Sequence, residues 1–195
     1  MTDGGRGSYH HGALRDALLT AAREILEEEG LEALSWRGIA RRANVSHQAP
    51  YNHFADKAEL LRAVADQGFS DLNQAMRSRI EAAGEGGARL RAAGVGYVVF
   101  AAQNPALFHL MFSPGLGPHP PDLSLETDRA RAYAALLDAV KSYGPPPADE
   151  RAARLRSLAA WSLAHGLAEL VILDIARHRE FGFEDLEAFA AAAIG

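Results

Sequence analysis

The stretch from Ser35 to Phe54 constrains the fold more than any other part of the chain, because it holds two helix starts separated by a turn. Ser35 is a favourable N-cap, Asn44 tolerates the left-handed backbone that ends a helix, and Ser46 is a second N-cap two residues later. The apolar face of the first helix is expected at Ile39, Ala40 and Ala43. The stretch therefore predicts two short helices joined by a tight turn, the helix-turn-helix arrangement.

The second of these helices, expected over about residues 47–54, is unusually polar for its length. Its side chains offer donors, acceptors and a flat ring, which suit base edges and phosphates. Pro50 falls in its first turn, where a missing N–H costs least. Residues 35–57 carry four basic side chains and one acidic one, a net charge of +3, whereas the whole chain carries −5. A basic island on an acidic protein indicates a local site for a polyanion.

Residues 9–61 resemble the DNA-binding domain of TetR-family transcriptional regulators. The matching positions are Ser35, Ile39, Ala40, Ala43, Asn44, Val45, Ser46, Tyr51, His53, Phe54, Asp56, Lys57, Leu60 and Leu61. The chain departs from the family at Asn44, where Gly is usual, but Asn also accepts left-handed geometry. The resemblance implies a DNA-binding domain over residues 1–57 and a ligand-binding and dimerisation domain over 58–195. It also implies a homodimer that binds a palindromic double-stranded operator, most simply as a repressor.

The residues expected to contact DNA lie on the helix before the motif, on the two helices of the motif and the turn between them, and at the start of the fourth helix. Base edges are assigned to His47, Gln48 and Asn52, and phosphates to Arg42, Tyr51, His53 and Lys57. Arg15, Ser35, Arg37 and Ser46 complete the expected interface. Lys57 lies within the capping-box pattern Asp56-x-x-Glu59 at the start of a helix, so a phosphate there would also meet exposed helix N–H groups.

The composition and the missing motifs exclude several other classes of protein. The 195 residues are 48% hydrophobic, enough for a full core, and the absence of cysteine excludes disulfides and thiolate metal sites. No two of the eight histidines have the spacing that places two ligands on one helix face, so neither a metal nor a cofactor is expected. The chain shows no nucleotide-binding loop, nucleophile elbow or membrane-length apolar run, and its first eight residues have no apolar stretch, so no leader is expected. We therefore expect a cytoplasmic protein with no membrane contact.

Helical periodicity continues along the chain and predicts an all-α fold. Residues 6–12 read as a polar tail before a helix that Gly30 ends, and the Asp56 box starts a helix reaching Ile80. Further helices are expected over 88–103, from 105 to about 112, around 133–143, over 148–178 and over 184–194. Residues 113–121 are expected to form a loop. No segment has the alternating pattern of a strand.

The segment 158–175 is apolar on nearly all sides, which requires cover on nearly all sides. One subunit of this size supplies one face, so a partner subunit is expected to supply another. The predicted two-fold interface, built from two helices of each subunit, contains Leu163, Leu167, Leu170, Val171 and Phe189. The alternative is that these side chains pack within one chain.

A set of large, soft side chains from several predicted helices suggests a pocket for a small, mostly apolar effector. Its members are Tyr97, Phe100, Phe108, Met111, Tyr133, Leu137 and Trp161, with His165 orienting a polar end of the ligand. Taken singly, each of these residues is better explained as core filling, and only the set as a whole favours a pocket. A partner protein, or no ligand at all, is the alternative source of regulation.

Ser162, His165 and Glu169 form a polar stripe at helical spacing in an otherwise apolar segment. The surrounding residues 159–170 resemble the Trp…His-Gly class of TetR-type C-terminal domains. The plain interpretation is a histidine satisfied by Glu169 or a backbone carbonyl within the core. An enzyme using His165 and Glu169 as an acid–base pair is a remote alternative, because it leaves the basic helix-turn-helix unexplained.

Overall fold

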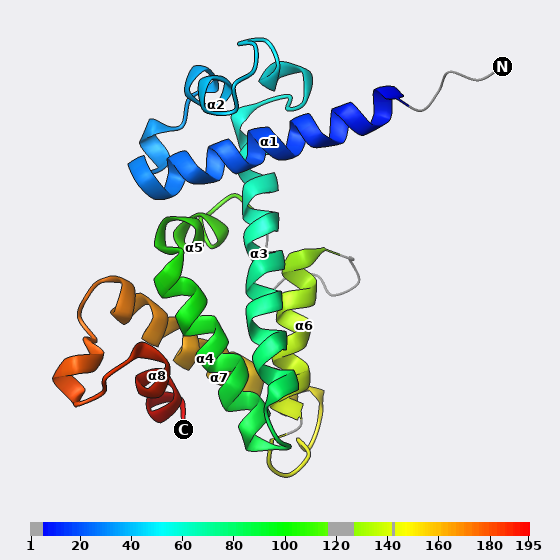
Figure 1. The fold of residues 1–195 in the computed structure, drawn as a ribbon. Coiled ribbons are helices and arrows are strands. Elements are labelled where there is room, and N and C mark those ends of the chain that lie inside the picture. Colours follow the sequence, from blue (N-terminus) through cyan, green and yellow to red (C-terminus); the bar gives the residue numbers. More distant parts are fainter. Residues whose placement is uncertain (1–5, 117–126, 142) are drawn as a thin grey trace. The chain divides into compact units, whose positions relative to one another are not determined.

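The computed structural model describes residues 6–116, 127–141 and 143–195, and side chains from Ala13 onward (Figure 1). All the regular elements in these ranges are helical, as predicted. The α-helices are α1 (Arg6–Glu29), α2 (Trp36–Arg42), α3 (Lys57–Ala82), α4 (Gly87–Gln103), α5 (Pro105–Met111), α6 (Asp128–Lys141), α7 (Glu150–Ile172) and α8 (Leu186–Ile194). Short 3-10 helices are η1 (Leu31–Ala33), η2 (Pro50–Asn52) and η3 (His178–Phe181). None of the described helices is both long enough and apolar enough to cross a bilayer.

The chain divides into two compact units. The first contains the described residues up to Asp66 together with 106–116, and the second contains 67–105 and the described residues from Thr127 onward. Because α3 and α5 each supply residues to both units, the packing boundary falls inside helices. The expected division at residue 57 coincides with the start of α3 and remains a proposal about function.

The first unit has a small core formed where α2 packs on α1. Leu18, Leu26, Ile39, Phe54 and Leu60 are all almost completely buried in it. The backbone of residues 6–12, expected to be a polar tail, is instead the first part of α1. Five large apolar side chains from α1, α2, α3 and the turn between them therefore hold the motif together.

The expected second helix of the motif is the main local difference from the sequence analysis. Residues 47–49 form a turn, and only Pro50–Asn52 form a helix, of the 3-10 type. Pro50 has no N–H to donate to the Ser46 carbonyl, and that carbonyl accepts the Ala49 amide at 3.0 Å. The i-to-i+3 bonds of Ala49, Asn52 and His53 tighten the segment into 3-10 geometry. Ser46 is thus not the N-cap of an α-helix.

The core of the second unit is organised around α4, which packs against α6, α7 and α8 (Figure 1). The side chains from Ala93 to Ala101 are all buried. A Cβ on Gly96 would lie 2.8 Å from the Ala75 carbonyl oxygen of α3, so only glycine permits this approach. A Cβ on Gly94 would lie 2.7 Å from Ile194 of α8. Small residues on α4 therefore allow helices to pack closely on two of its sides.

Helix α7 starts at the Asp149 cap, whose carboxylate accepts the Ala152 amide at 2.7 Å. It ends at Ile172, six residues before the end expected from periodicity. The amides of Ile175 and Ala176 both donate to the Leu170 carbonyl, and Asp174 adopts a φ of 57°. This reversal of the chain satisfies the last carbonyls and stops the helix.

Candidate nucleic-acid interface and effector site

The first helix of the DNA-binding motif is capped as its sequence predicts. The Ser35 hydroxyl accepts the Gly38 amide at 3.2 Å, and Asn44 has a φ of 54°, the left-handed conformation. The Val45 amide returns to the Ala40 carbonyl at 3.0 Å. Ser35 is exposed, and its hydroxyl oxygen already accepts the Gly38 amide. In a contact with DNA, the hydroxyl would therefore donate its proton to a phosphate oxygen.

The side chains assigned to DNA form an exposed row after the turn. Ala49, Pro50 and Phe54 are buried and anchor the segment. The exposed side chains are Arg37, Ser46, His47, Gln48, Tyr51 and Asn52, while His53 is half-buried. The Tyr51 ring lies 5.4 Å from that of Trp36, which restricts its position. The predicted readers from His47 to Asn52 are therefore exposed, although on a tighter turn than predicted.

The start of α3 has the predicted capping box. The Asp56 carboxylate accepts the Glu59 amide at 2.7 Å, and the Glu59 carboxylate accepts the Ala55 amide, also at 2.7 Å. The second bond goes to the residue before the cap rather than to the cap itself. Lys57 is exposed at the first position of the helix. Its ammonium and the helix dipole together favour an anion at this end.

Arg15 of α1 reaches the same motif from the side. Its guanidinium carbon lies 5.1 Å from the centre of the Phe54 ring, and the side chain is half-buried. Because a guanidinium over an aromatic face is attracted to it, the head of Arg15 is held in one place. A phosphate contact would meet a cation that is already oriented.

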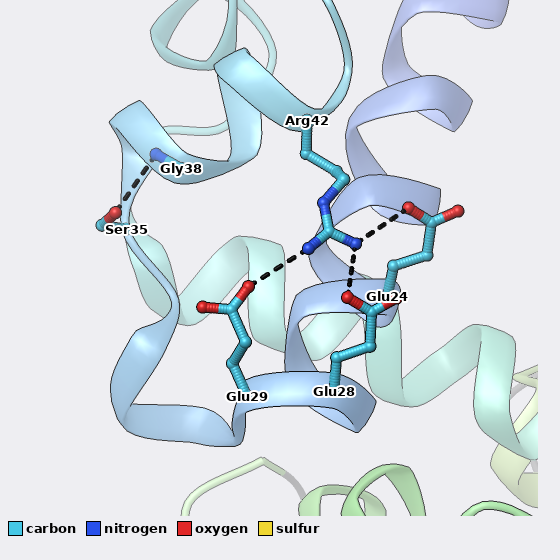
Figure 2. A network of polar contacts seen from close by, with 6 residues as sticks. All are labelled: Glu24, Glu28, Glu29, Ser35, Gly38 and Arg42. Atoms are coloured by element: carbon cyan, nitrogen blue, oxygen red, sulfur yellow. Dashed lines mark hydrogen bonds and ion pairs between the residues drawn. The ribbon is translucent and has the colours of Figure 1, made fainter.

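Arg42 has a role that the sequence analysis did not predict (Figure 2). Its Nη1 lies 2.8 Å from Glu28 and 3.5 Å from Glu24, and its Nη2 lies 3.1 Å from Glu29. The hydrogen bond to Glu28 is the main cause that raises the pKa of Arg42. The guanidinium thus ties α2 to α1, and the expected phosphate contact would require it to leave these carboxylates. We infer that Arg42 positions α2, and its predicted phosphate contact stays a prediction.

In the second unit, three polar side chains form a hydrogen-bonded chain. The indole N–H of Trp161 donates to the Tyr97 hydroxyl at 3.2 Å, and that hydroxyl lies 2.8 Å from Nδ1 of His165. Burial raises the pKa of the Tyr97 phenol far above its ordinary value, so the hydroxyl keeps its proton. The hydroxyl accepts from Trp161, and it shares a second hydrogen bond with Nδ1 of His165, whose direction is set by the tautomer of the imidazole.

Nε2 of His165 faces Glu169 at 3.9 Å, one helical turn later. The predicted polar stripe therefore divides: His165 and Glu169 are half-buried and near each other, whereas Ser162 is exposed. Tyr97, which the sequence places in the same predicted pocket as His165, lies 68 residues away in the chain, and their direct hydrogen bond was not predicted. No local pattern could have revealed this pairing.

Four of the predicted effector residues form one aromatic cluster. Ring centres are 6.3 Å apart for Tyr133 and Trp161, 5.8 Å for Trp161 and His165, and 6.1 Å for Tyr97 and His165. Phe100 is buried on α4 and Leu137 is half-buried on α6, both in the same unit. Phe108 and Met111 are completely buried residues of the first unit, so we assign them to its core.

Two clefts of ligand size open in the second unit. A cleft of about 420 Å³ is lined by Tyr133, Glu150, Arg151, Arg154, Leu155, Leu158 and Trp161. Another, of about 490 Å³, is lined by Leu90, Gly94, Leu136, Tyr143, Gly144, Pro145, Arg156, Ala159, Ala160, Leu163, Ala164 and Ile194. Only the first contains predicted effector residues, Tyr133 and Trp161. Its α7 lining recurs every three or four residues, a spacing that marks one helix face.

The predicted dimer residues differ in exposure. Leu163 and Leu170 are 49% and 42% exposed, and Leu167 and Val171 are half-buried. Phe189 is buried within its own chain, with ring centres 5.3 Å from Phe181 and 5.7 Å from Phe183. We therefore reassign Phe189 to the core, while the leucines of α7 leave an apolar face open.

A capped, exposed helix-turn-helix followed by a separate helical unit defines the class of helical DNA-binding regulators. Comparison with known sequences agrees: residues 18–64 match the family described as bacterial regulatory proteins, tetR family. Residues 90–195 match the tetracyclin repressor-like C-terminal domain. The chain belongs to the TetR family of transcriptional regulators.

A solved structure of a protein of unknown function from Rhodococcus sp. RHA1 is 31% identical, with a TM-score of 0.74, over 97% of this chain and 95% of that one. The transcriptional activator FasR of Mycolicibacterium smegmatis is 33% identical over 50% of this chain and 45% of its own. The class C tetracycline repressor of Escherichia coli is 40% identical over 27% of this chain and 24% of its own. The matches thus span less than half the length of these two curated relatives.

Proposed function

We propose that the protein is a homodimeric, cytoplasmic repressor that binds a palindromic operator and releases it when a small effector binds. The observation that carries the DNA assignment is the exposed row of His47, Gln48, Tyr51 and Asn52 between the capped helix α2 and Lys57. These side chains provide base-reading groups beside a cation at a helix N-terminus. Two such rows related by a two-fold axis would meet half-sites about one helical turn apart or somewhat more.

The open apolar face of α7 supports the homodimer. Leu163 and Leu170 are exposed, and between them Gly166 has no neighbouring atom within 4 Å of where a Cβ would be. A second α7 could approach closely over the glycine and cover the flanking leucines. An isologous contact of this kind would provide the two-fold axis that the palindrome requires.

A contact between α1 and the start of α5 supports a route for regulation. The Glu27 carboxylate accepts the amides of Leu107 at 2.9 Å and of Ala106 at 3.3 Å. Since α5 follows α4 after Asn104 alone, a displacement of α4 would be passed to α1 through this cap. Suppose that α4 has one position in the DNA-bound protein and another after displacement. An effector that binds these two states with different affinities would change the free energy of operator binding by the difference between its two binding free energies, typically about 1–3 kcal/mol.

The named relatives include one activator and one repressor, so family membership does not decide between activation and repression. We favour repression, because a dimer bound across a promoter needs no further contact to block transcription. The second candidate function is a regulator of the same fold that responds to a partner protein instead of a small molecule. The remote alternative is an enzyme that uses His165 and Glu169, but Nδ1 of His165 already forms a hydrogen bond with Tyr97.

Selection from a pool of random duplexes tests the DNA assignment. The purified protein should enrich a two-fold symmetric site, and the logarithm of its affinity should fall steeply with the logarithm of salt concentration. Placing the selected site over a reporter promoter then distinguishes repression from activation. Failure to enrich any symmetric site, or binding that is insensitive to salt, would overturn the proposal.

A further inference from the structure

The cleft of about 420 Å³ between α6 and α7, called here the α6–α7 cleft, combines two kinds of lining. Tyr133 and Trp161 supply aromatic rings, Leu155 and Leu158 supply aliphatic ones, and Glu150, Arg151 and Arg154 supply charge. Its volume lies within the range of about 300–1,000 Å³ typical of small-molecule sites. A site with both an apolar wall and charged groups suits an amphipathic ligand.

The charges of the α6–α7 cleft leave one cation uncompensated. Arg154 forms an ion pair with Glu150 one turn before it. Arg151 is exposed and makes no ion pair with any residue that the structure describes. The three groups sum to +1, on a chain whose net charge is −5. A guanidinium that has no carboxylate partner is a ready receptor for the carboxylate of a ligand, which its two parallel N–H groups can grip.

The apolar wall is open to water in the free protein. Leu155 and Leu158 are 57% and 49% exposed, while the half-buried Tyr133 and Trp161 meet edge to face. Covering these groups with an aromatic ring would remove apolar surface from water and add ring contacts. A purely ionic ligand would leave this wall exposed, so the preferred ligand carries an apolar body.

The α6–α7 cleft and the predicted dimer contact occupy different lengths of α7. The α7 residues that line the cleft run from Glu150 to Trp161, whereas Leu163 and Leu170 follow in the second half of the helix. Leu158 and Leu163 are also about 140° apart around the helix, although Leu155 and Leu163 are only about 80° apart. A second subunit that contacts only the second half of α7 would leave the cleft open.

We propose that the α6–α7 cleft is the effector site and that its ligand is a carboxylate with an aromatic body, such as an arylalkyl carboxylate. The carboxylate pairs with Arg151, and the aryl body lies against Tyr133, Leu158 and Trp161. This inference rests on the proposed effector-responsive function and names the ligand class and its anchor. Since Trp161 also donates to the buried Tyr97 of α4, a ligand that shifts the indole acts directly on the central helix of the unit.

The fluorescence of Trp161 offers a direct test in the full-length protein. The chain has two tryptophans, so a Trp36→Phe background leaves Trp161 as the only one. Three probes share one body and differ in head group: 4-phenylbutyrate, 4-phenylbutan-1-ol and 4-phenylbutylamine. The carboxylate should change the fluorescence and bind about tenfold more tightly than the alcohol, with the amine weakest.

A pair of variants assigns the preference to one residue. Arg151→Gln should bring the carboxylate and the alcohol to within about twofold of each other, leaving the affinity for the alcohol unchanged. Arg179→Gln removes an exposed arginine of η3 that does not line the cleft and should change nothing. Equal binding of the three probes, no fluorescence change at millimolar concentration, or a carboxylate preference that survives Arg151→Gln would each overturn the inference.

DNA binding by the native full-length protein separates this inference from the proposed function, because Trp36 packs against Tyr51 and the Trp36→Phe background is used for the fluorescence alone. Binding of the native protein to the selected duplex depends on the first unit and needs no probe. Normal DNA binding without a carboxylate preference would reject the α6–α7 cleft alone. A carboxylate preference without DNA binding would reject the proposed function and leave the cleft assigned.

Discussion

The carboxylate of Glu27, near the end of α1, accepts the backbone N–H of Leu107 in the first turn of α5 at 2.9 Å. The two residues are 80 positions apart, and Glu27 also accepts the amide of Ala106. A side chain of one helix thus satisfies the free N–H groups at the start of another, as a cap does within a single helix.

Glu27→Ala should destabilise the protein by about 0.5–2 kcal/mol, because it leaves two helix N–H groups without their acceptor. Urea unfolding followed by circular dichroism measures this difference. Glu32→Ala is a matched control, since Glu32 is exposed on η1. Equal stability of the two variants would show that the cap is unimportant. If α5 transmits the effector signal, Glu27→Ala should also reduce the effect of a bound ligand on operator affinity.

Lys57 and Arg42 should respond differently to replacement by glutamine. Lys57→Gln should weaken binding to all duplexes and reduce the salt slope by about one unit, because one phosphate contact is lost. Arg42→Gln should leave the slope unchanged and lower protein stability, since Arg42 is held by Glu24, Glu28 and Glu29 (Figure 2). Affinities measured across a range of salt concentrations decide this. A reduced slope for Arg42→Gln would return that residue to the DNA interface.

Gln48→Ala should relax sequence preference at one position in each half-site. Gln48 is exposed at the turn before Pro50 and carries both a donor and an acceptor. Loss of a bidentate base contact costs about 1–3 kcal/mol for the preferred base and little for the others. Affinities for single-base variants of the selected operator measure the change. A uniform loss over all sequences would instead identify Gln48 as a backbone contact.

The features that could be predicted from the sequence are those encoded within a few residues. The Ser35 cap, the left-handed Asn44 and the Asp56–Glu59 box each depend on neighbours three or four positions apart, and each is present. Helix existence follows from periodicity for the same reason. The early end of α7 is the exception, because the reversal at Asp174 has no glycine or proline to mark it.

Features that join distant segments could not be predicted in this way. The basic island that contains Arg42 predicts a phosphate contact, but carboxylates 13 and 14 residues earlier in the chain hold its guanidinium. The pairing of Tyr97 with His165 depends on how α4 packs against α7. Pro50 was recognised, yet the resulting 3-10 geometry depends on how the buried Ala49 and Phe54 fix a very short segment.

Tyr97 gives the folded protein a specific sensitivity to alkaline pH. Burial raises its pKa, so above about pH 10 the unfolded chain loses this proton while the folded chain keeps it. Stability from this group is complete below pH 10 and falls by about 1.4 kcal/mol for each further pH unit. Urea unfolding between pH 9 and 11 should show this loss for the native chain and not for Tyr97→Phe. Tyr143→Phe, at an exposed position, is the control and should behave like the native chain.

The open face of α7 provides the last prediction. Leu170→Glu places a charge on a side chain that is 42% exposed in one subunit, so the isolated fold should tolerate it. In a dimer the same carboxylate would be buried opposite its symmetry mate without a cation, which is strongly unfavourable. Sedimentation at tens of micromolar should therefore show dimers for the native chain and monomers for Leu170→Glu.

Leu31→Glu, at an exposed leucine of η1, is the matched control and should remain dimeric. Because both half-sites must be held at once, loss of the dimer should also reduce operator affinity strongly, while thermal unfolding of the monomer changes little. A native chain that sediments as a monomer would exclude the α7 interface. A Leu170→Glu variant that unfolds, rather than dissociates, would instead place Leu170 in the packing of a single chain.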